Sequence, residues 1–270
     1  MSSETPQVDH FAEANKAHFN NIANEYDELP HARERARRTA NAVRKAYSFD
    51  ENETTVMEFA CGTGLVSREL APYSKRIVGV DISQGMVDQF NRRVTNQGIP
   101  FEEMNAVCVE LKGEAGELGD ERFDVIFCAS SYHHFTSIDD VTRVLAYFLK
   151  PGGSLFVVDL MKEGRGVVHG HDHGHGEGRG HGQDDGHEHG HDHGHGHGHG
   201  HEQAQSLFPE DVHKFVPHRH GLGEEDMRKV FEGAGLESFS FENAFTAKQH
   251  DRDVKLFIAS GKKSTGVQSR

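Results

Sequence analysis

Two kinds of hydrophobic pattern alternate along the chain. Short apolar runs, typical of strands buried on both faces of a parallel sheet, occur at residues 56–59, 76–81, 99–109, 122–129 and 154–159. Between them lie stretches with apolar residues three or four positions apart, which is typical of amphipathic helices. Strands that alternate with helices predict an α/β fold built on a mostly parallel sheet.

Besides a helix after Gly64, the helical pattern predicts five helices that flank these strands. They cover residues 11–26, 32–47, a segment that begins after Ser83 as its N-cap, 138–149 and 224–235. The runs at 236–247 and 254–260 alternate between apolar and polar residues and predict two further strands. The chain should therefore contain seven strands, with residues 1 to about 10 poorly ordered.

The stretch from Val56 to Gly64, V-M-E-F-A-C-G-T-G, organises the chain. A strand there enters a turn with glycines at Gly62 and Gly64, and an amphipathic helix follows. This arrangement brings backbone N–H groups and a helix N-terminus close to a ligand. The next strand ends in Asp81, where a carboxylate accepts hydrogen bonds from ribose hydroxyls in nucleotide-binding α/β folds. Together the two features predict a nucleotide-type ligand.

Composition and net charge argue against several classes of function. The chain has 270 residues and a formal net charge of −14, which disfavours nucleic acid and anionic membrane surfaces as partners. It has no apolar run of about 18 residues, so no membrane span is expected. The three cysteines, Cys61, Cys108 and Cys128, have no paired spacing and fall in predicted core strands or turns. This pattern favours a reduced compartment, the cytoplasm.

A histidine-glycine tract interrupts the chain at residues 164–205. Of the 22 histidines, 13 lie between His169 and His201. The tract has almost no apolar residues to bury and is predicted to be a disordered insertion. It divides one domain into residues 1–163 and 206–263, followed by a tail at 264–270. Imidazoles bind Zn²⁺, Ni²⁺ and Cu²⁺, so adventitious binding of these ions is expected, but the repetitive spacing predicts no defined metal site; a selected metal-related role stays open.

The glycine turn resembles the first motif of class I S-adenosylmethionine-dependent methyltransferases, [D/E]-x-[G/A]-x-G-x-G, at residues 58–64. The G-x-G-x-x-G pattern of dinucleotide binders would need a third glycine where Ser67 stands. Residues 19–27 resemble the F-x-x-[I/A]-A-x-x-Y-D segment of small-molecule methyltransferases of the ubiquinone-biosynthesis type. Residues 81–86 resemble D-x-S-x-x-M, and 149–153 match L-K-P-G-G. The resemblance implies a doubly wound, seven-stranded, Rossmann-like sheet that ends in an antiparallel hairpin.

The resemblance also implies S-adenosylmethionine as the cofactor and assigns residues to it. Tyr26 would lie near the amino-acid end of the cofactor, in a segment that closes over it. Asp81 would hold the ribose, and Asn105 would stand at the adenine edge in place of the family's acid. The remaining residues would surround the methionine moiety (Glu58, Ala60, Gly62 and Gly64) or flank the adenine (Ile82 and Met86).

The turn after the fourth strand, S-S-Y-H-H-F, resembles the family's L-H-H segment and should face the methyl group or the acceptor. Histidine removes protons near neutral pH, so His133 and His134 are the candidate general bases. Tyr132 and His218 are less favoured candidates. The turn lacks the proline of methyltransferases that act on amino groups of bases or glutamine, which argues against that subclass.

These observations predict methyl transfer to a small-molecule acceptor. Two alternatives stay open at this stage. One is a metal-handling protein that keeps an inactive methyltransferase scaffold and works through the histidine tract. The other is a protein methyltransferase, since the acidic balance does not argue against a protein substrate.

Overall fold

A computed structural model describes residues 9–162, 206–249 and 252–266 of the chain. The histidine-rich tract, with its predicted disorder and its predicted metal affinity, lies outside the described residues. So do the first eight residues, where poor order was expected.

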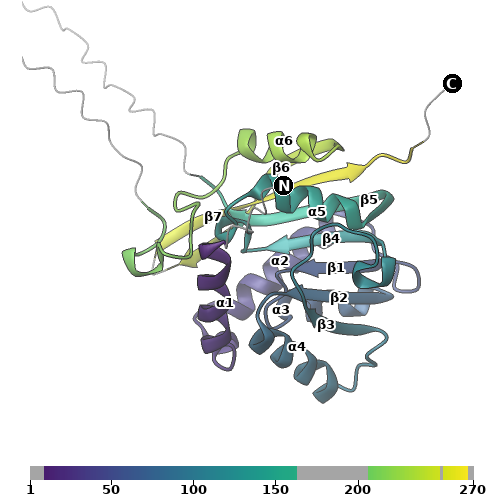
Figure 1. The fold of residues 1–270 in the computed structure, drawn as a ribbon, viewed down its shortest axis with the longest axis horizontal. Helices are drawn as coiled ribbons and strands as arrows, with labels where there is room; N and C mark the ends of the chain where they lie inside the picture. The colour runs from purple at the N-terminus through teal and green to yellow at the C-terminus, as the bar shows by residue number, and fades with distance from the viewer. Residues whose placement is uncertain (1–8, 163–205, 250–251, 267–270) are drawn as a thin grey trace, which may run out of the picture. The chain divides into compact units, whose positions relative to one another are not determined.

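Seven strands form one mixed sheet with the order β3-β2-β1-β4-β5-β7-β6 (Figure 1). The strands are β1 (Thr55–Phe59), β2 (Arg76–Asp81), β3 (Met104–Cys108), β4 (Phe123–Ala129), β5 (Leu149–Leu160), β6 (Leu236–Gln249) and β7 (Arg252–Lys263). The first five are parallel, whereas β7 pairs antiparallel with both β5 and β6. The predicted fold class, a doubly wound seven-stranded sheet with a closing antiparallel hairpin, is confirmed.

The helices cover both faces of the sheet. They are α1 (His10–Ile22), α2 (Ala32–Ala46), α3 (Leu65–Leu70), α4 (Gln84–Asn96), α5 (Ile138–Phe148) and α6 (Glu224–Gly233). Helices α2, α3 and α4 contribute to the core on one face, and α5 and α6 to the core on the other. Helix α1 lies across the edge toward which the arrows of β1 and β4 point (Figure 1).

The central strand β4 shows why the apolar runs become strands. Val125 and Phe127 belong to one core, and Ile126 and Cys128 to the other. A strand buried on both faces needs apolar residues at every position, because successive side chains point to opposite faces. The continuous apolar run therefore predicts an interior strand of a three-layer fold.

Several predicted boundaries differ from the structure, among them those of the first helix and of the third and fifth strands. The third strand begins at Met104, because Ile99 instead donates its N–H to Val94 O at 3.2 Å and closes helix α4. The fifth strand begins at Leu149, which pairs with Phe123 before the register of β4 and β5 shifts. The residues K-P-G-G at 150–153 therefore form an irregular start of β5 rather than a separate turn. The first helix ends at Ile22, and a short 3₁₀ helix, η1 (Tyr26–Glu28), follows.

Residues before and after the histidine tract contribute to the same sheet, since β5 pairs with β7 from Ser154 to Leu160. The cysteines are free; Cys61 and Cys128 are buried, but Cys108 is exposed at the end of β3 rather than in the core. None of the helices in the described part of the chain combines the length and the apolar character needed to cross a membrane.

Candidate functional site

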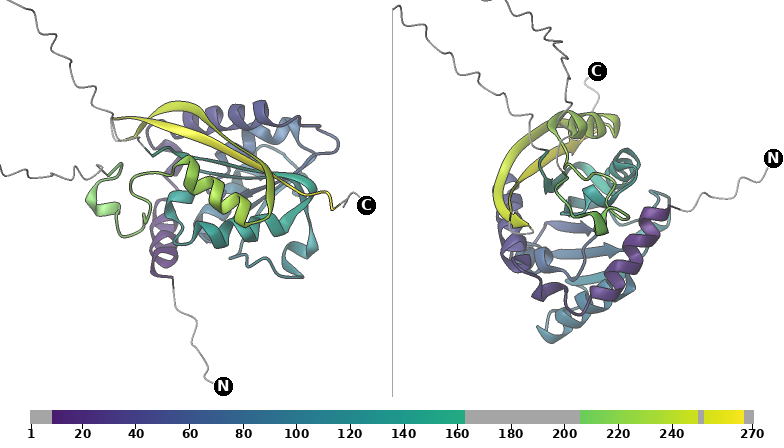
Figure 2. Two further views of the ribbon diagram at one scale, coloured as in Figure 1. Left: turned by 90° about the horizontal axis from the view of Figure 1, so that it is seen from above. Right: turned by 90° about the vertical axis from the view of Figure 1, so that its left-hand side faces the viewer.

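The predicted site residues gather at the carboxyl ends of β1, β2 and β4. The order β2-β1-β4 places these three ends side by side. Seen from that side, α1 and the segment of residues 206–222 lie in front of the sheet (Figure 2). The site is therefore built on neighbouring strand ends and covered by two segments from distant parts of the sequence.

The glycine turn after β1 leaves room for a ligand. Ala60, Gly62 and Gly64 all have positive φ values, of 54°, 53° and 78°. A Cβ on Gly64 would lie 2.5 Å from the ring of Phe90, so this glycine lets α4 pack against the turn. A Cβ on Gly62 would meet no atom within 4 Å, so open space lies in front of this residue. One glycine thus serves packing and the other keeps the backbone accessible.

Asp81 closes the turn from the neighbouring strand. The N–H of Gly62 donates to Asp81 Oδ2 at 2.8 Å, and the N–H of Ser83 donates to Asp81 Oδ1 at 2.9 Å. Burial raises the pKa of Asp81, although these backbone hydrogen bonds act in the opposite direction. Each carboxylate oxygen has two lone pairs, so both retain the capacity to accept a hydrogen bond from a ribose hydroxyl.

Glu58 is a second carboxyl group at the end of β1. It is 3% exposed and accepts hydrogen bonds at Oε2 from the backbone N–H of Ser67, at 3.1 Å, and from the Ser67 hydroxyl. Burial raises the pKa of Glu58 to about 8. A cationic group bound beside it would favour the charged carboxylate. Glu58 is therefore suited to receive an ammonium group.

Tyr26, from η1, completes this part of the site. Burial raises the pKa of its hydroxyl, and the negative charges of Asp81 and Glu58 act in the same direction. The hydroxyl therefore lies in the field of both carboxylates. The structure brings together four elements that the sequence predicted to meet: the segment with Tyr26, the glycine turn, Glu58 and Asp81.

The raised pKa of Glu58 leads to a prediction for the unliganded protein. Its carboxyl group keeps a proton that the unfolded chain releases near the ordinary pKa of 4.5. The contribution to the free energy of unfolding is full below pH 4.5 and is lost as the pH rises through the folded-state pKa of about 8. This one group can contribute a slope of up to about 1.4 kcal/mol per pH unit.

Urea unfolding of the wild type and of Glu58→Gln across this pH range measures the effect. We expect the difference in unfolding free energy between the two proteins to change with pH, with the wild type losing stability toward alkaline pH. Parallel stability curves would show that Glu58 carries no shifted pKa.

The adenine side of the site agrees less completely with the sequence prediction. Ile82 follows Asp81 directly, and Met86 is 1% exposed in the first turn of α4. Asn105 is buried within β3 and pairs with Val78, whereas Cys108 pairs with Asp81. Asn105 thus lies three residues before the strand end. The structure does not bring its side chain to the edge where Asp81 lies, and Cys108 holds the position level with Asp81.

His133 is fixed by a buried carboxylate. Its Nδ1 lies 2.7 Å from Oδ1 of Asp159, and its backbone N–H donates to Asp159 Oδ2 at 3.2 Å. A carboxylate only accepts, so the ring hydrogen is on Nδ1, and Nε2 of the neutral imidazole keeps its lone pair. No hydrogen bond in the described part of the chain reaches Nε2. His133 therefore has the tautomer and the orientation that a general base requires.

Asp159 is fully buried at the carboxyl end of β5. Burial alone would raise the pKa of Asp159, but His133 and the backbone N–H of Leu160 hold it below its usual value. The carboxylate therefore stays charged and can stabilise an imidazolium that forms on His133.

The other candidate bases have different partners. His134 binds the carbonyl of Phe215 through Nδ1 at 2.9 Å, and burial lowers its pKa to about 3. His218 uses Nε2 on the carbonyl of Phe135 at 3.1 Å, and burial lowers its pKa too. The hydroxyl of Tyr132 points away into the core, 3.1 Å from Thr142 Oγ1. Burial raises the pKa of the Tyr132 hydroxyl, so its surroundings do not favour it as a base.

Aromatic rings line the space around the histidines. Phe208 stacks on His133 with the ring centroids 5.0 Å apart. Phe19, from α1, contacts His134 at 5.5 Å and Tyr26 at 6.3 Å. Phe19 thus connects the cofactor side with the histidine side. The segment at 212–223 lies against the histidines, because the N–H of His218 donates to His133 O at 3.2 Å.

Sequence reasoning missed Asp159 and Phe208. Asp159 ends an apolar strand in the same way as Asp81 does, and this signal could have singled it out. Phe208 has no such signal, because it lies in an irregular segment directly after the tract.

Together, the fold and the turn with its two carboxylates define a nucleotide-binding α/β domain of the methyltransferase kind. Residues 57–157 match the family described as "Methyltransferase domain". An uncharacterized methyltransferase of Schizosaccharomyces pombe is 43% identical over 113 residues, which are 41% of this chain and 40% of the relative. A ubiquinone biosynthesis O-methyltransferase of Coxiella burnetii is 30% identical over 101 residues, 37% of this chain and 41% of that one.

A solved structure extends the comparison beyond the matched stretch. Magnesium protoporphyrin IX methyltransferase from Synechocystis, with bound S-adenosylmethionine, aligns over 97% of this chain and 100% of its own, with a TM-score of 0.57 and 14% identity. At this identity the likeness concerns the fold alone. The chain spans less than half of the length of the curated relatives that it matches.

The matched stretch, residues 57–157, belongs to the methyltransferase domain family, and the comparisons support a class I S-adenosylmethionine-dependent methyltransferase with S-adenosylmethionine as its cofactor. The residues present fit this group: open space lies in front of Gly62, Glu58 is suited to the ammonium, and Asp81 has lone pairs left for the ribose. Among the described residues, no group of three or more His, Cys, Asp or Glu side chains is arranged to hold a metal ion.

Proposed function

We propose that the protein transfers a methyl group from S-adenosylmethionine to a small molecule, with His133 as general base. The single observation that carries this proposal is the buried His133–Asp159 pair next to a turn that fits the cofactor. A buried carboxylate that fixes one ring nitrogen of a histidine and leaves the other without a partner is the arrangement that orients a general base.

In this proposal Glu58 and Tyr26 hold the amino-acid end of the cofactor, and Asp81 holds the ribose. The bound cofactor supplies a methyl group on a good leaving group. The protein itself must orient the acceptor, exclude water and remove a proton. His133 removes that proton through Nε2, while Asp159 stabilises the resulting imidazolium and keeps the ring in place.

Burial of the base supports a small acceptor. His133 is 5% exposed, and α1 and the segment at 206–222 lie over the strand ends. An acceptor on the surface of a folded protein would have to displace both segments, whereas a small molecule needs only a brief opening. The aromatic rings of Phe19 and Phe208 favour a flat or apolar acceptor over a strongly charged one.

The experiment is a transfer assay with S-adenosylmethionine that carries a tritiated methyl group. The purified chain is incubated with panels of phenols, carboxylic acids, thiols and amines, and with a panel of purified proteins. We expect label to move to at least one small-molecule class and not to the proteins. Transfer to proteins alone would contradict the proposed acceptor class.

Deletion of residues 164–205 tests the metal-handling alternative. We expect the deletion variant to retain transfer activity with the same acceptor, measured in the presence of a chelator, because the site residues all lie outside the tract. Loss of activity in a variant with an unchanged melting temperature would mean that the tract takes part in the function.

A further inference from the structure

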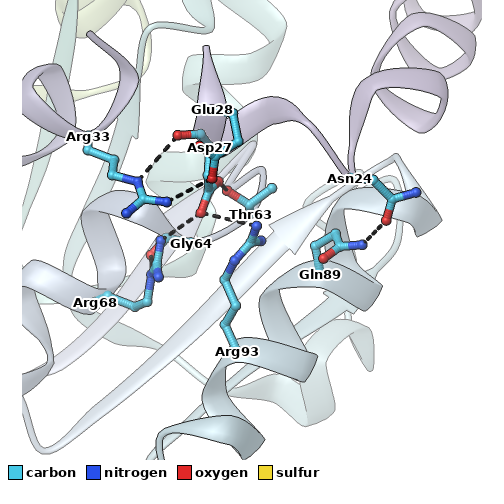
Figure 3. Close-up of polar contacts among 9 residues, drawn as sticks. All are labelled: Asn24, Asp27, Glu28, Arg33, Thr63, Gly64, Arg68, Gln89 and Arg93. Atoms are coloured by element: carbon cyan, nitrogen blue, oxygen red, sulfur yellow. Dashed lines mark hydrogen bonds and ion pairs between the residues drawn. The ribbon is translucent and has the colours of Figure 1, made fainter. Parts of the chain in front are cut away.

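Asp27 is a buried carboxylate outside the residues assigned to the cofactor. It follows Tyr26 in η1 and is 6% exposed. The Thr63 hydroxyl donates to Asp27 Oδ1 at 2.5 Å, and the guanidinium groups of Arg68 and Arg93 each lie 3.1 Å from Oδ2 (Figure 3). One carboxylate thus receives two arginines and a hydroxyl.

The partners of Asp27 come from the elements that build the cofactor site. Thr63 belongs to the glycine turn between Gly62 and Gly64, Arg68 to α3, and Arg93 to α4. Asp27 therefore ties the segment that carries Tyr26 to the turn and to both helices that follow the first two strands.

The contacts of the N-terminal segment with residues 83–89 join uncharged groups. Asn20 Oδ1 accepts from the Ser83 hydroxyl at 2.8 Å and from the Gly85 N–H at 2.9 Å. Asn24 pairs with Gln89. Each such hydrogen bond between uncharged groups contributes modestly to the stability of the folded chain. The hydrogen bonds to the Asp27 carboxylate are charge-assisted and therefore stronger than bonds between uncharged groups. They are also buried, so salt screens them less.

We propose that Asp27 is a positioning residue of the cofactor site, which holds residues 9–28 on the glycine turn and so sets how fast the cofactor exchanges. The inference rests on the proposed function, since it assumes that S-adenosylmethionine binds beneath this segment. Asp27 acts through its neighbours: it fixes the place of Tyr26 and, through Thr63, the conformation of the turn.

The surroundings of Arg93 indicate that the two arginines, Arg68 and Arg93, depend on the single carboxylate of Asp27. Burial lowers the pKa of Arg93, and the negative charge of Asp27 offsets part of this effect. The Nη1 atom of Arg93 is buried and has no hydrogen-bond partner in the described part of the chain. Without Asp27, two guanidinium groups would face each other with no carboxylate between them. The segment of residues 9–28 should then detach from the glycine turn more often.

The test compares Asp27→Asn with Glu28→Gln in the full chain. Glu28 is the matched control, because it is the next residue and also pairs with an arginine, Arg33, at 3.0 Å, but its side chain is 75% exposed. Two quantities are measured: the release rate of tritiated S-adenosylmethionine in a chase with unlabelled cofactor, and hydrogen exchange of residues 9–28 without ligand.

We expect Asp27→Asn to release the cofactor at least about tenfold faster, because bonds to a charged group are lost, and to exchange faster in residues 9–28 while β1 and β4 stay protected. Glu28→Gln should match the wild type in both. A general loss of protection across the sheet would indicate a merely structural role and overturn the proposal, as would unchanged release and exchange in Asp27→Asn.

If Asp27→Asn does not fold, Arg93→Gln provides the second test. It should also speed release and exchange, and an unchanged rate of both would overturn the proposal. A wild type that binds no S-adenosylmethionine would refute the proposed function instead. Hydrogen exchange of residues 9–28 in the unliganded variants would then still report whether Asp27 fastens the segment.

Discussion

Replacing His133 by glutamine is expected to lower kcat about 10²–10⁴-fold, the usual contribution of a general base. Glutamine has no basic nitrogen to take the acceptor's proton, whereas the cofactor contacts proposed for Asp81 and Glu58 would remain. The affinity for S-adenosylmethionine should therefore change little. Steady-state kinetics with the acceptor found in the transfer assay, together with calorimetric cofactor binding, measures both effects.

His134→Gln is the comparison, because His134 lies beside His133 but its pKa is lowered to about 3 by burial. We expect this variant to keep most of the activity. His133→Gln leaves the carboxylate of Asp159 buried without its partner, which is destabilising. The double variant with Asp159→Asn also removes the buried carboxylate charge and should fold better, yet remain as slow as His133→Gln. Full turnover in folded His133→Gln would show that the base is another group or that none is needed.

Replacing Asp81 by alanine is expected to weaken binding of S-adenosylmethionine by at least about tenfold, because hydrogen bonds to a charged group are lost. The substitution also frees the N–H groups of Gly62 and Ser83, which Asp81 now accepts. The turn itself should therefore become less ordered, which adds to the loss of affinity. Isothermal titration calorimetry measures the dissociation constant.

Asp88→Ala is the matched control for Asp81→Ala. Asp88 is exposed on α4 and bonds only to the side chain of Gln84 among the described residues. We expect its variant to bind the cofactor like the wild type. Melting curves of both variants show whether the fold is kept. Equal affinities of the wild type and folded Asp81→Ala would remove Asp81 from the site.

The sequence predicted the centre of the fold well because burial is periodic. The run at 76–81 has the bounds of β2, since apolar residues on both faces are followed by a charged residue where the strand leaves the sheet. The glycine turn was predictable because few residue types adopt the positive φ angles that its backbone requires. The third strand was predicted too long, because the apolar residue Ile99 serves as a helix cap and periodicity does not distinguish the two.

The candidate site was predictable only where its residues follow each other closely in the sequence. Glu58, Gly62 and Asp81 lie on one β-turn-α-β unit, so spacing brings them together. The pair of His133 and Asp159 joins two strand ends, and it depends on the register of β4 against β5. The position of Asn105 likewise depends on register.

Asp27 illustrates a different limit. In the sequence, Asp27 lies between Tyr26 and Glu28 in a polar stretch. A polar stretch predicts residues exposed on the surface. Its burial follows from Arg68 and Arg93, which are 41 and 66 residues further along the chain and look equally exposed in a helical pattern. A buried ionic cluster of polar residues carries no hydrophobic signal, so only the assembled structure reveals it.

The most direct test of the central claim is calorimetric titration of S-adenosylmethionine and S-adenosylhomocysteine into the full chain, with a chelator present to keep metal ions off the histidine tract. We predict that both bind in the micromolar range at one site per chain. Absence of binding by protein that melts cooperatively would contradict the assignment of the glycine turn, Glu58 and Asp81 as a cofactor site.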